Sequence, residues 1–305
     1  MSREFSGNAI KRLGKALRSG PIDGKLILDL EDYRATFDPL LIDLSLQIEE
    51  LLKESDLPFL LTGRSKRTKS IIRKLKRSQN RGMDLSRMGD IVGLRLLVAD
   101  HEAQDQALKQ ILEHLEIKEV HDYRERPPKS GYRCIHILVR KGKRLLEIQL
   151  RTLAQHLWAV ESESFGEKVK EGTVPAEIEA YLQVLQGAIV SIESGEGDAP
   201  TDEDLTPLGV KRSPLKAFLP RMIEQFAEAT AAQSDDQPPF SYLLVYDSMR
   251  AQLIQELRYE GASREEALAH YSVFSRMVDE ERFDVIVLNA SSPIGMRVTH
   301  PRYFQ

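Results

Sequence analysis

The sequence has a single cysteine and no long hydrophobic run. Cys134 is the one cysteine among 305 residues, so the chain cannot form an internal disulfide. No apolar run approaches the ~18 residues that span a membrane. Residues 1–20 are basic but lack the apolar stretch of a secretory signal. These absences predict a reducing, cytoplasmic location and no association with membranes.

Charge is nearly balanced over the whole chain but uneven along it. The formal net charge is −4, with 41% hydrophobic and 30% charged residues, which is typical of a soluble globular protein. A negative net charge argues against a protein that coats nucleic acid, although a cationic block can still bind a phosphate-rich ligand. The length predicts a principal domain of roughly 150 to 200 residues and a smaller unit.

Hydrophobic periodicity predicts alternating helices and strands. The expected helices are 31–55, 68–77, 102–115, 153–164 and 175–194, and the expected strands are 58–62, 91–98, 117–120 and a hairpin within 129–151. Beyond an acidic, proline-bearing segment we expect a strand over 240–246, helices within 249–281 and a strand over 283–288. This order predicts an α/β (α+β) fold, with a mixed sheet flanked by helices and a small C-terminal α/β appendage.

The hairpin has a predictable register. Its two-residue Gly-Lys turn at 142–143 places glycine first, as in a type II′ turn. Counting outward from that turn puts His136 opposite Gln149 and Leu138 opposite Glu147. The sequence therefore brings an imidazole, an amide and a carboxylate together on neighbouring strands.

Alternation of side chains divides the hairpin into two unlike faces. Tyr132 shares a face with the ionisable residues, and Cys134 lies opposite Arg151 on that face. The other face carries only aliphatic side chains, which are Ile135, Ile137, Val139, Leu146, Ile148 and Leu150. One face is expected to pack in the core and the other to form a polar, ionisable surface.

Residues 64–81 form a cationic block in which about half of the residues are lysine or arginine, against ~10 to 12% in a typical chain. In a helix, Ser70 and Lys74 lie on one flank, and Arg77 follows them. A solvated helix face is one interpretation of this block. A triphosphate-binding surface is the other, because arginine and lysine are the side chains that bind phosphate groups.

Two carboxylates stand at places where an unpaired charge is costly. Asp90 precedes the apolar strand 91–98 and Glu147 lies within the hairpin. Both suit a Mg²⁺ site, since Mg²⁺ takes one or two protein carboxylates together with substrate phosphates and waters. Salt bridges with Arg95 or Arg151 are the alternative. Strict alternation places Asp90 and Arg95 on opposite faces unless the strand bulges.

Together these residues resemble the synthetase domain of the RelA/SpoT family, over about residues 55 to 170. The resemblance rests on several motifs in the right order. They are Arg64, Lys66, Ser70 and Lys74; Asp90 to Arg95; Asp122, Tyr123, Pro127, Gly131, Tyr132, Arg133 and His136; Glu147, Gln149, Arg151 and Thr152; and Trp158. Cys134 stands where serine is usual, and we interpret it as a small strand residue rather than a nucleophile.

The resemblance implies a nucleotidyltransferase-like fold and an enzyme that transfers the β,γ-pyrophosphate of ATP to the 3′-hydroxyl of GDP or GTP, giving (p)ppGpp. It implies ATP binding by Arg64, Lys66, Ser70, Lys74 and Arg95; acceptor binding by Lys129, Tyr132, Arg133, His136, Arg151 and His156; and catalysis by Asp90, Glu147 and Gln149. Arg64 and Arg95 would sandwich the adenine, and Tyr132 would stack on the acceptor base. Asp90 and Glu147 would bind Mg²⁺.

The chain departs from the family pattern at two of these positions. Lys129 is displaced by one residue from the lysine of many small synthetases. His156 stands where those proteins often carry an asparagine near the acceptor base, and a core or capping histidine is an equal alternative there. The first histidine is His101, so the metal-dependent hydrolase domain of long family members is not expected.

The predicted organisation has four parts. They are an N-terminal helical region over 1–55, a pyrophosphotransferase domain over 56–195, a linker with a helix over 196–239 and a small α/β unit of unassigned role over 240–305. ATP and GDP or GTP are the expected ligands, and a homo-oligomer is compatible with the sequence. Two alternatives stay open: a toxin-type synthetase that modifies tRNA 3′ ends or adenine nucleotides, and a catalytically silent module that binds nucleotides or an antitoxin protein.

Overall fold

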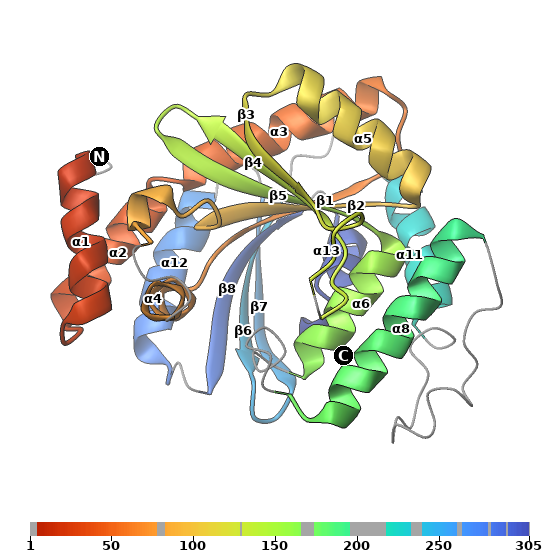
Figure 1. Cartoon of the computed structure of the whole chain (residues 1–305). Helices are drawn as coiled ribbons and strands as arrows, with labels where there is room; N and C mark the ends of the chain where they lie inside the picture. Colours follow the sequence, from red (N-terminus) through yellow and green to blue (C-terminus); the bar gives the residue numbers. More distant parts are fainter. Residues whose placement is uncertain are drawn as a thin grey trace.

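The computed structural model describes residues 5–77, 83–128, 130–165, 174–195, 218–232, 240–260, 264–279, 282–290 and 292–304. Within these ranges, eight strands form one mixed sheet in the order β3-β4-β5-β2-β1-β8-β6-β7 (Figure 1). Strands β2 and β5 are parallel, and every other neighbouring pair is antiparallel. The predicted α/β class, with a mixed sheet flanked by helices, is confirmed.

The strands have these bounds: β1 Leu60–Ser65, β2 Val92–Val98, β3 Ile117–Asp122, β4 Ile135–Lys141, β5 Arg144–Thr152, β6 Phe240–Asp247, β7 Gln252–Glu260 and β8 Phe283–Ala290. The helices are α1 Gly7–Ser19, α2 Gly24–Ala35, α3 Asp38–Glu54, α4 Thr68–Lys76, α5 His101–His114, α6 Leu153–Ser164, α8 Ala176–Ser194, α11 Leu219–Ala231, α12 Arg264–Met277 and α13 Pro293–Thr299. Two 3-10 turns, η2 Leu85–Arg87 and η5 Pro301–Tyr303, complete the described elements.

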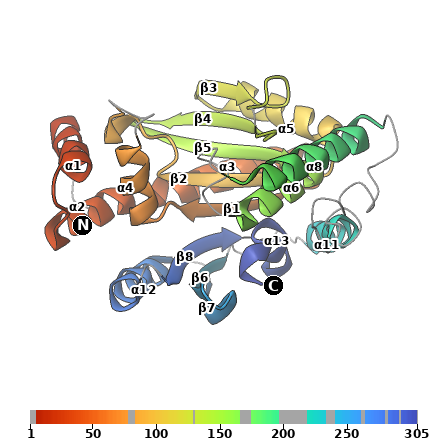
Figure 2. The same cartoon turned by 60° about the horizontal axis from the view of Figure 1, so that its bottom comes forward.

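Each face of the sheet is buried by its own set of helices. Leu96 packs in a core with α3 and α5, whereas its neighbour Leu97 packs in a second core with α6 and α8. Successive strand residues point to opposite faces, so these two helix pairs cover opposite sides of the sheet, as Figures 1 and 2 show. The face toward α6 is the one that carries the ionisable residues of the hairpin.

The hairpin β4–β5 has the predicted register. His136 pairs with Gln149 and Leu138 with Glu147. Gly142 in the turn has a φ of +59°, a left-handed conformation that glycine adopts without strain, as the first position of a type II′ turn requires. The six aliphatic residues predicted to face the core are at most 1% exposed. Both the turn and the division into two faces are therefore confirmed.

The predicted helix over 31–55 is wrong in extent, because the chain forms two helices there. Helix α2 ends at Ala35 and α3 begins at Asp38. Pro39 lies in the first turn of α3. Since proline has no N–H to donate and clashes with the preceding turn, it begins a helix but does not continue one. The strand predicted over 58–62 corresponds to β1, which ends three residues later than predicted, at Ser65. Arg64 therefore lies within β1.

The C-terminal residues extend the same sheet. Strand β8 pairs with β1 through Arg64 and Leu288, and β6 and β7 continue outward from it. The helices predicted within 249–281 are corrected in part, because 252–260 is the edge strand β7 and α12 is the one helix among the described residues of this range. None of the helices in the described ranges combines the length and apolarity needed to cross a lipid bilayer.

Candidate active site

Residues of four strands align in a row on the polar face of the sheet. Arg95 on β2 is beside Thr62 on β1 and beside Gln149 on β5, and Gln149 is opposite His136 on β4. One step along the strands, Gly93 lies between Arg64 and Glu147. The sheet pairing therefore brings residues from widely separated motifs onto one surface.

Five side chains of the hairpin form a closed ring of hydrogen bonds. Tyr132 Oη lies 2.7 Å from His136 Nε2, and His136 Nδ1 lies 2.9 Å from Glu147 Oε1. Gln149 Nε2 donates to Glu147 Oε2 at 2.8 Å, and Gln149 Oε1 accepts from Arg151 Nη2 at 2.9 Å. Arg151 Nη2 also donates to Tyr132 Oη at 2.9 Å, which closes the ring. Each side chain is thus oriented by two others.

The ring holds Glu147 as a carboxylate. Burial alone would raise its pKa, but the hydrogen bond and charge of His136, with a further bond from Gln149, lower it. For His136, burial alone would lower the pKa, whereas hydrogen bonds to Cys134 and Glu147 and their charges raise it to about 9. A protonated imidazole donates through both ring nitrogens, which suits its contacts to Glu147 and Tyr132.

Asp90 is held by two lysines at the edge of the same surface. Its Oδ2 accepts from Lys66 Nζ and Lys74 Nζ, each at 2.7 Å. Burial alone would raise the pKa of Asp90, but the two ammonium groups lower it to about 2. The salt bridges that the sequence left open for Asp90 are therefore made with lysines of the cationic block.

One oxygen of Asp90 is available to a ligand. Oδ1 is buried, and no hydrogen-bond partner for it occurs among the described residues. Glu147 lines the same cavity, and its pKa responds to the charge of Asp90. Two carboxylates with spare oxygen lone pairs fit Mg²⁺, which completes its shell with phosphate oxygens and waters.

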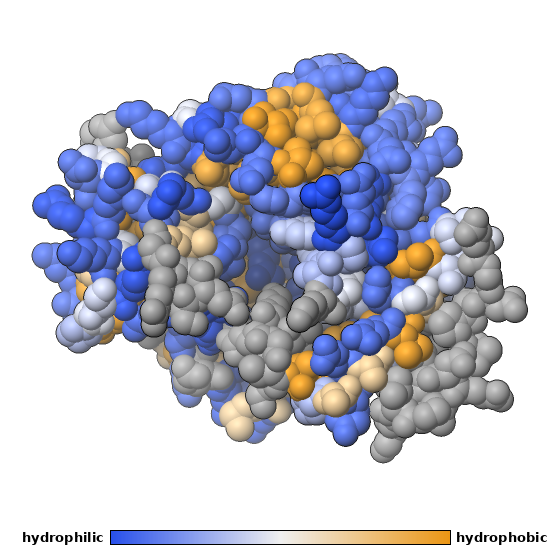
Figure 3. Space-filling view, in the orientation of Figure 1, coloured by the Kyte–Doolittle hydropathy of each residue, from blue (hydrophilic) through white to orange (hydrophobic). Residues whose placement is uncertain are grey.

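A cavity of about 630 Å³ lies over this surface. The predicted site residues that line it are Arg64, Lys66, Asp90, Arg95, Tyr132, His136, Glu147, Gln149 and Arg151. In Figure 3 a hollow is visible near the centre of the molecule, where Figure 1 places the space between α4 and α6. The structure thus gathers most of the predicted site into one cavity.

A second cavity, of about 160 Å³, adjoins the first and carries the residues predicted to bind phosphates. Ser70 and Lys74 of α4 line it, and it shares Arg64, Lys66 and Arg95 with the larger cavity. The cationic face of α4 therefore points toward the sheet residues of the predicted site.

Three predicted acceptor residues lie elsewhere or outside the described chain. Arg133 Nη1 donates to the backbone oxygen of Arg124 at 2.9 Å and does not line the larger cavity. His156 is fully buried, and its Nε2 lies 3.0 Å from the backbone oxygen of Val298, as the core interpretation of this histidine predicts. Lys129 falls outside the described residues.

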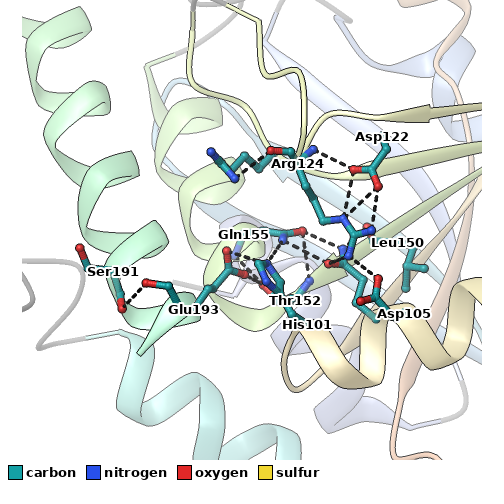
Figure 4. A network of polar contacts seen from close by, with 12 residues as sticks. His101, Asp105, Asp122, Arg124, Leu150, Thr152, Gln155, Ser191 and Glu193 are labelled. Carbon is teal, nitrogen blue, oxygen red and sulfur yellow. Dashed lines mark hydrogen bonds and ion pairs between the residues drawn. The ribbon is translucent and has the colours of Figure 1, made fainter. Parts of the chain in front are cut away.

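A polar network behind the hairpin fixes the segment that leads into it (Figure 4). Arg124 makes an ion pair with Asp122 at 2.7 Å, and its backbone oxygen accepts from Arg133. Gln104 on α5 donates to the backbone oxygen of Leu150 at 3.0 Å. This network ties the end of β3 and helix α5 to strand β5.

The same network continues into the start of α6. The Thr152 side chain accepts from the Gln155 backbone N–H in a capping box, and Thr152 Oγ1 donates to Glu193 of α8. Glu193 also lies 3.0 Å from His101 Nε2. Since Leu150 and Thr152 flank Arg151, these contacts fix the backbone that carries one member of the ring.

Sequence reasoning missed two ionisable residues of the cavity wall. Glu163 lies on α6 four residues after Ala159, which also lines the cavity, so periodicity could have indicated it. His300 also lines the cavity, but it lies far along the chain and no local pattern points to it. Both lie near Arg95, whose Nη2 is 3.9 Å from Glu163 Oε1.

The part of the chain that carries the motifs is similar to known proteins. Residues 63–166 match a family model described as a region found in RelA / SpoT proteins, and this range includes every predicted site residue. An uncharacterised protein of Mycobacterium tuberculosis is 28% identical over 219 residues, which cover 64% of this chain and 76% of that protein. The GTP pyrophosphokinase YjbM of Bacillus subtilis is 31% identical over 134 residues, which cover 40% of this chain and 63% of that protein.

Solved structures show a similar arrangement over about half of the chain. Small alarmone synthetase 1 from Bacillus subtilis, bound to its product pppGpp, is 24% identical with a TM-score of 0.45 and covers 55% of this chain and 94% of that one. A GTP pyrophosphokinase family protein from Streptococcus pneumoniae is 22% identical with a TM-score of 0.48 and covers 61% of this chain and 99% of that one.

Proposed function

Because residues 63–166 match the model of the RelA/SpoT family, we propose that this chain is an ATP-dependent pyrophosphokinase of that family. The proposed reaction transfers the β,γ-pyrophosphate of ATP to the 3′-hydroxyl of GDP or GTP. A bond forms between the acceptor oxygen and the β-phosphorus, and the bond between that phosphorus and the oxygen of the α-phosphate breaks. The products are (p)ppGpp and AMP.

The observation that carries the proposal is the environment of Glu147. This carboxylate stands in one cavity with Asp90, and the ring of hydrogen bonds fixes its orientation. Each oxygen accepts one bond from a neighbour and keeps a second lone pair. Glu147 can therefore accept a hydrogen bond from the attacking hydroxyl, draw off its proton and align it for in-line attack.

Cations surround the place that the donor phosphates would occupy. Lys66 and Lys74 flank Asp90, and Arg64 and Arg95 lie on the adjoining strands. Transfer of a phosphoryl-type group depends mainly on positioning and on neutralising charge. We assign Ser70 with the two lysines to the phosphates of ATP and the two arginines to its adenine.

Asp90 and Glu147 are the residues that would hold Mg²⁺, which would neutralise phosphate charge when bound. The buried Oδ1 of Asp90 supports this assignment. The pairing of Oδ2 with two lysines keeps the carboxylate ionised over the physiological pH range and leaves the other oxygen for a metal ion.

The acceptor end of the cavity is assigned to the residues of the ring. Tyr132 lines it beside Trp158, with ring centroids 5.9 Å apart, which supports stacking of an acceptor base on an aromatic wall. His136 and Arg151 carry positive charge toward the same space and would contact acceptor phosphates. His156 lies outside this wall, so we assign it no contact with the acceptor.

The test is a labelled-phosphate assay with a panel of acceptors. Purified protein with Mg²⁺ and ATP labelled on the γ-phosphate is given GDP, GTP, ADP or bulk tRNA, and Glu147→Gln is the inactive control. The proposal expects label on GDP or GTP, absent in the variant. Label on tRNA or on adenine nucleotides would favour a toxin-type synthetase, and label on none of them would contradict the proposed reaction.

A further inference from the structure

The C-terminal segment His300–Tyr303 reaches the cationic end of the site. His300 lines both cavities, and Pro301, Arg302 and Tyr303 line the smaller one. This segment follows α13, which packs against β1, α11 and β8, and Figure 1 draws it in the darkest blue near the centre of the molecule. Residues more than 200 positions apart in the sequence thus form one wall.

Three contacts hold this segment and the end of α13 that leads into it. Arg95 Nη1 donates to the backbone oxygen of Thr299, and His156 Nε2 lies 3.0 Å from that of Val298. Arg302 Nη2 lies 3.7 Å from Asp284 Oδ2. Two of these anchors belong to the family-matched range and the third to the C-terminal part of the sheet, so the segment joins the two halves of the chain at the cavity.

Asp284 pairs with two arginines that line the smaller cavity. This carboxylate of β8 is 5% exposed and pairs with both Arg67 and Arg302. Two guanidinium groups that share one carboxylate keep a net positive charge. Both arginines therefore remain able to bind an anion while Asp284 keeps them in position.

The charges that line the smaller cavity are strongly unbalanced. Among its described lining residues, Glu163 is the one carboxylate, and eight side chains are cationic. The cations are Arg64, Lys66, Arg67, Arg73, Lys74, Arg77, Arg95 and Arg302. Asp90 and Asp284 pair with four of these cations, and a bound anion would neutralise further charge at the cavity. A polyphosphate chain has the charge and length for such a site.

His300 differs from these cations because its imidazole is neutral. Burial, with the charges of Arg95 and Arg64, holds the pKa of His300 well below its ordinary value. A neutral imidazole is a poor ligand for phosphate but can hydrogen-bond and pack against a nucleoside. It lies between the two cavities, next to the arginines assigned to the adenine.

We propose that the C-terminal segment completes the donor-nucleotide site, with Arg302 binding the polyphosphate of ATP and His300 contacting its nucleoside. This inference rests on the proposed function, because it takes ATP as the donor. It adds to that function two residues outside the family-matched range. It also gives the C-terminal part of the chain a role in catalysis.

Calorimetry with two nucleotides tests the proposal. The probes are α,β-methylene ATP, which resists transfer, and AMP, which lacks the β- and γ-phosphates, both with Mg²⁺. Arg302→Gln is expected to weaken binding of the ATP analogue about tenfold, since a charge-assisted hydrogen bond is lost, and to leave AMP binding within about twofold. Arg302→Lys is expected to recover most of the loss. His300→Ala is expected to weaken both ligands.

Arg297→Gln is the matched control. Arg297 belongs to helix α13, which leads into the segment, is exposed and lines neither cavity, so its substitution is expected to leave both affinities unchanged. Wild-type affinity for the analogue in Arg302→Gln, or an equal loss in Arg297→Gln, overturns the inference and leaves the proposed function standing. Failure of the wild-type protein to bind either nucleotide overturns both.

Discussion

His136 and Glu147 lie diagonally across neighbouring strands, with Nδ1 2.9 Å from Oε1. The residue directly opposite His136 is Gln149, so the imidazole reaches past its partner to the carboxylate two residues away. Diagonal neighbours in an antiparallel pair are within reach of such side chains. Gln149 bonds the other oxygen of the same carboxylate. Two neighbours thus fix one carboxylate, and the proposed chemistry depends on it.

Replacing Glu147 by glutamine is expected to lower the rate of transfer at least about 100-fold. A positioned general base contributes roughly 100- to 10,000-fold, and an amide cannot accept the proton. Initial rates with saturating ATP and GDP measure the effect. Glu119→Gln is the control, because Glu119 is an exposed carboxylate on β3. A Glu147→Gln protein that keeps a tenth of the wild-type rate would exclude Glu147 as the base.

Stability is expected to depend on pH through His136. Its pKa is raised from 6.5 to about 9 in the folded protein, so its contribution is fully present below about pH 6.5 and is lost as pH rises through about 9. The contribution is on the order of 3 kcal/mol at most, from about 1.4 kcal/mol per pKa unit. Urea unfolding of wild type and His136→Gln from pH 6 to 10 checks this. A gap between the two curves that does not narrow with rising pH would argue against it.

Tyr132 is expected to serve the acceptor and not the donor. Tyr132→Ala should raise KM for GDP or GTP by about 5-fold or more, since stacking on a base contributes ~1 to 3 kcal/mol, and leave affinity for α,β-methylene ATP within about twofold. Tyr132→Phe keeps the ring and loses the bonds to His136 and Arg151. Its KM should rise less than that of Tyr132→Ala. Equal effects of the two changes would assign the role to the hydroxyl instead.

Asp90→Asn is expected to raise the Mg²⁺ concentration needed for half-maximal activity by about tenfold or more, because it removes one of the two proposed anionic ligands. Asp105→Asn is the control, since Asp105 is an exposed carboxylate of α5. Activity is measured across a Mg²⁺ titration after treatment with a chelator. An unchanged half-saturation in Asp90→Asn would remove Asp90 from the metal site.

Much of the hairpin could be predicted because its information is local. A two-residue turn and strict alternation fix which residues of β4 and β5 are opposite each other, and the structure has His136 opposite Gln149 as expected. The position of the Asp90 side chain was harder to predict. It precedes β2 rather than lying in it, so alternation along the strand does not govern its side chain, and no bulge is needed to bring it to the face of Arg95.

The C-terminal contribution could not be predicted from local pattern. The contact between Arg95 and Thr299 joins residues 204 positions apart. Strand β7 is an exposed edge with polar residues on both sides, so its hydrophobic periodicity is weak and does not predict a strand there. Pairing of β8 with β1 joins the C-terminal strands to the rest of the sheet. This pairing depends on the assembly of the whole sheet and not on a local pattern.

Tracing both ends of ATP through one turnover tests the central claim most directly. ATP labelled on the α-phosphate and ATP labelled on the γ-phosphate are each incubated with the protein, Mg²⁺ and GDP, and the products are separated and quantified. Transfer of pyrophosphate as a unit predicts that the γ label appears in a guanine nucleotide while the α label appears in an equal amount of AMP. Formation of ADP in place of AMP, or guanine nucleotide without label, would contradict the account.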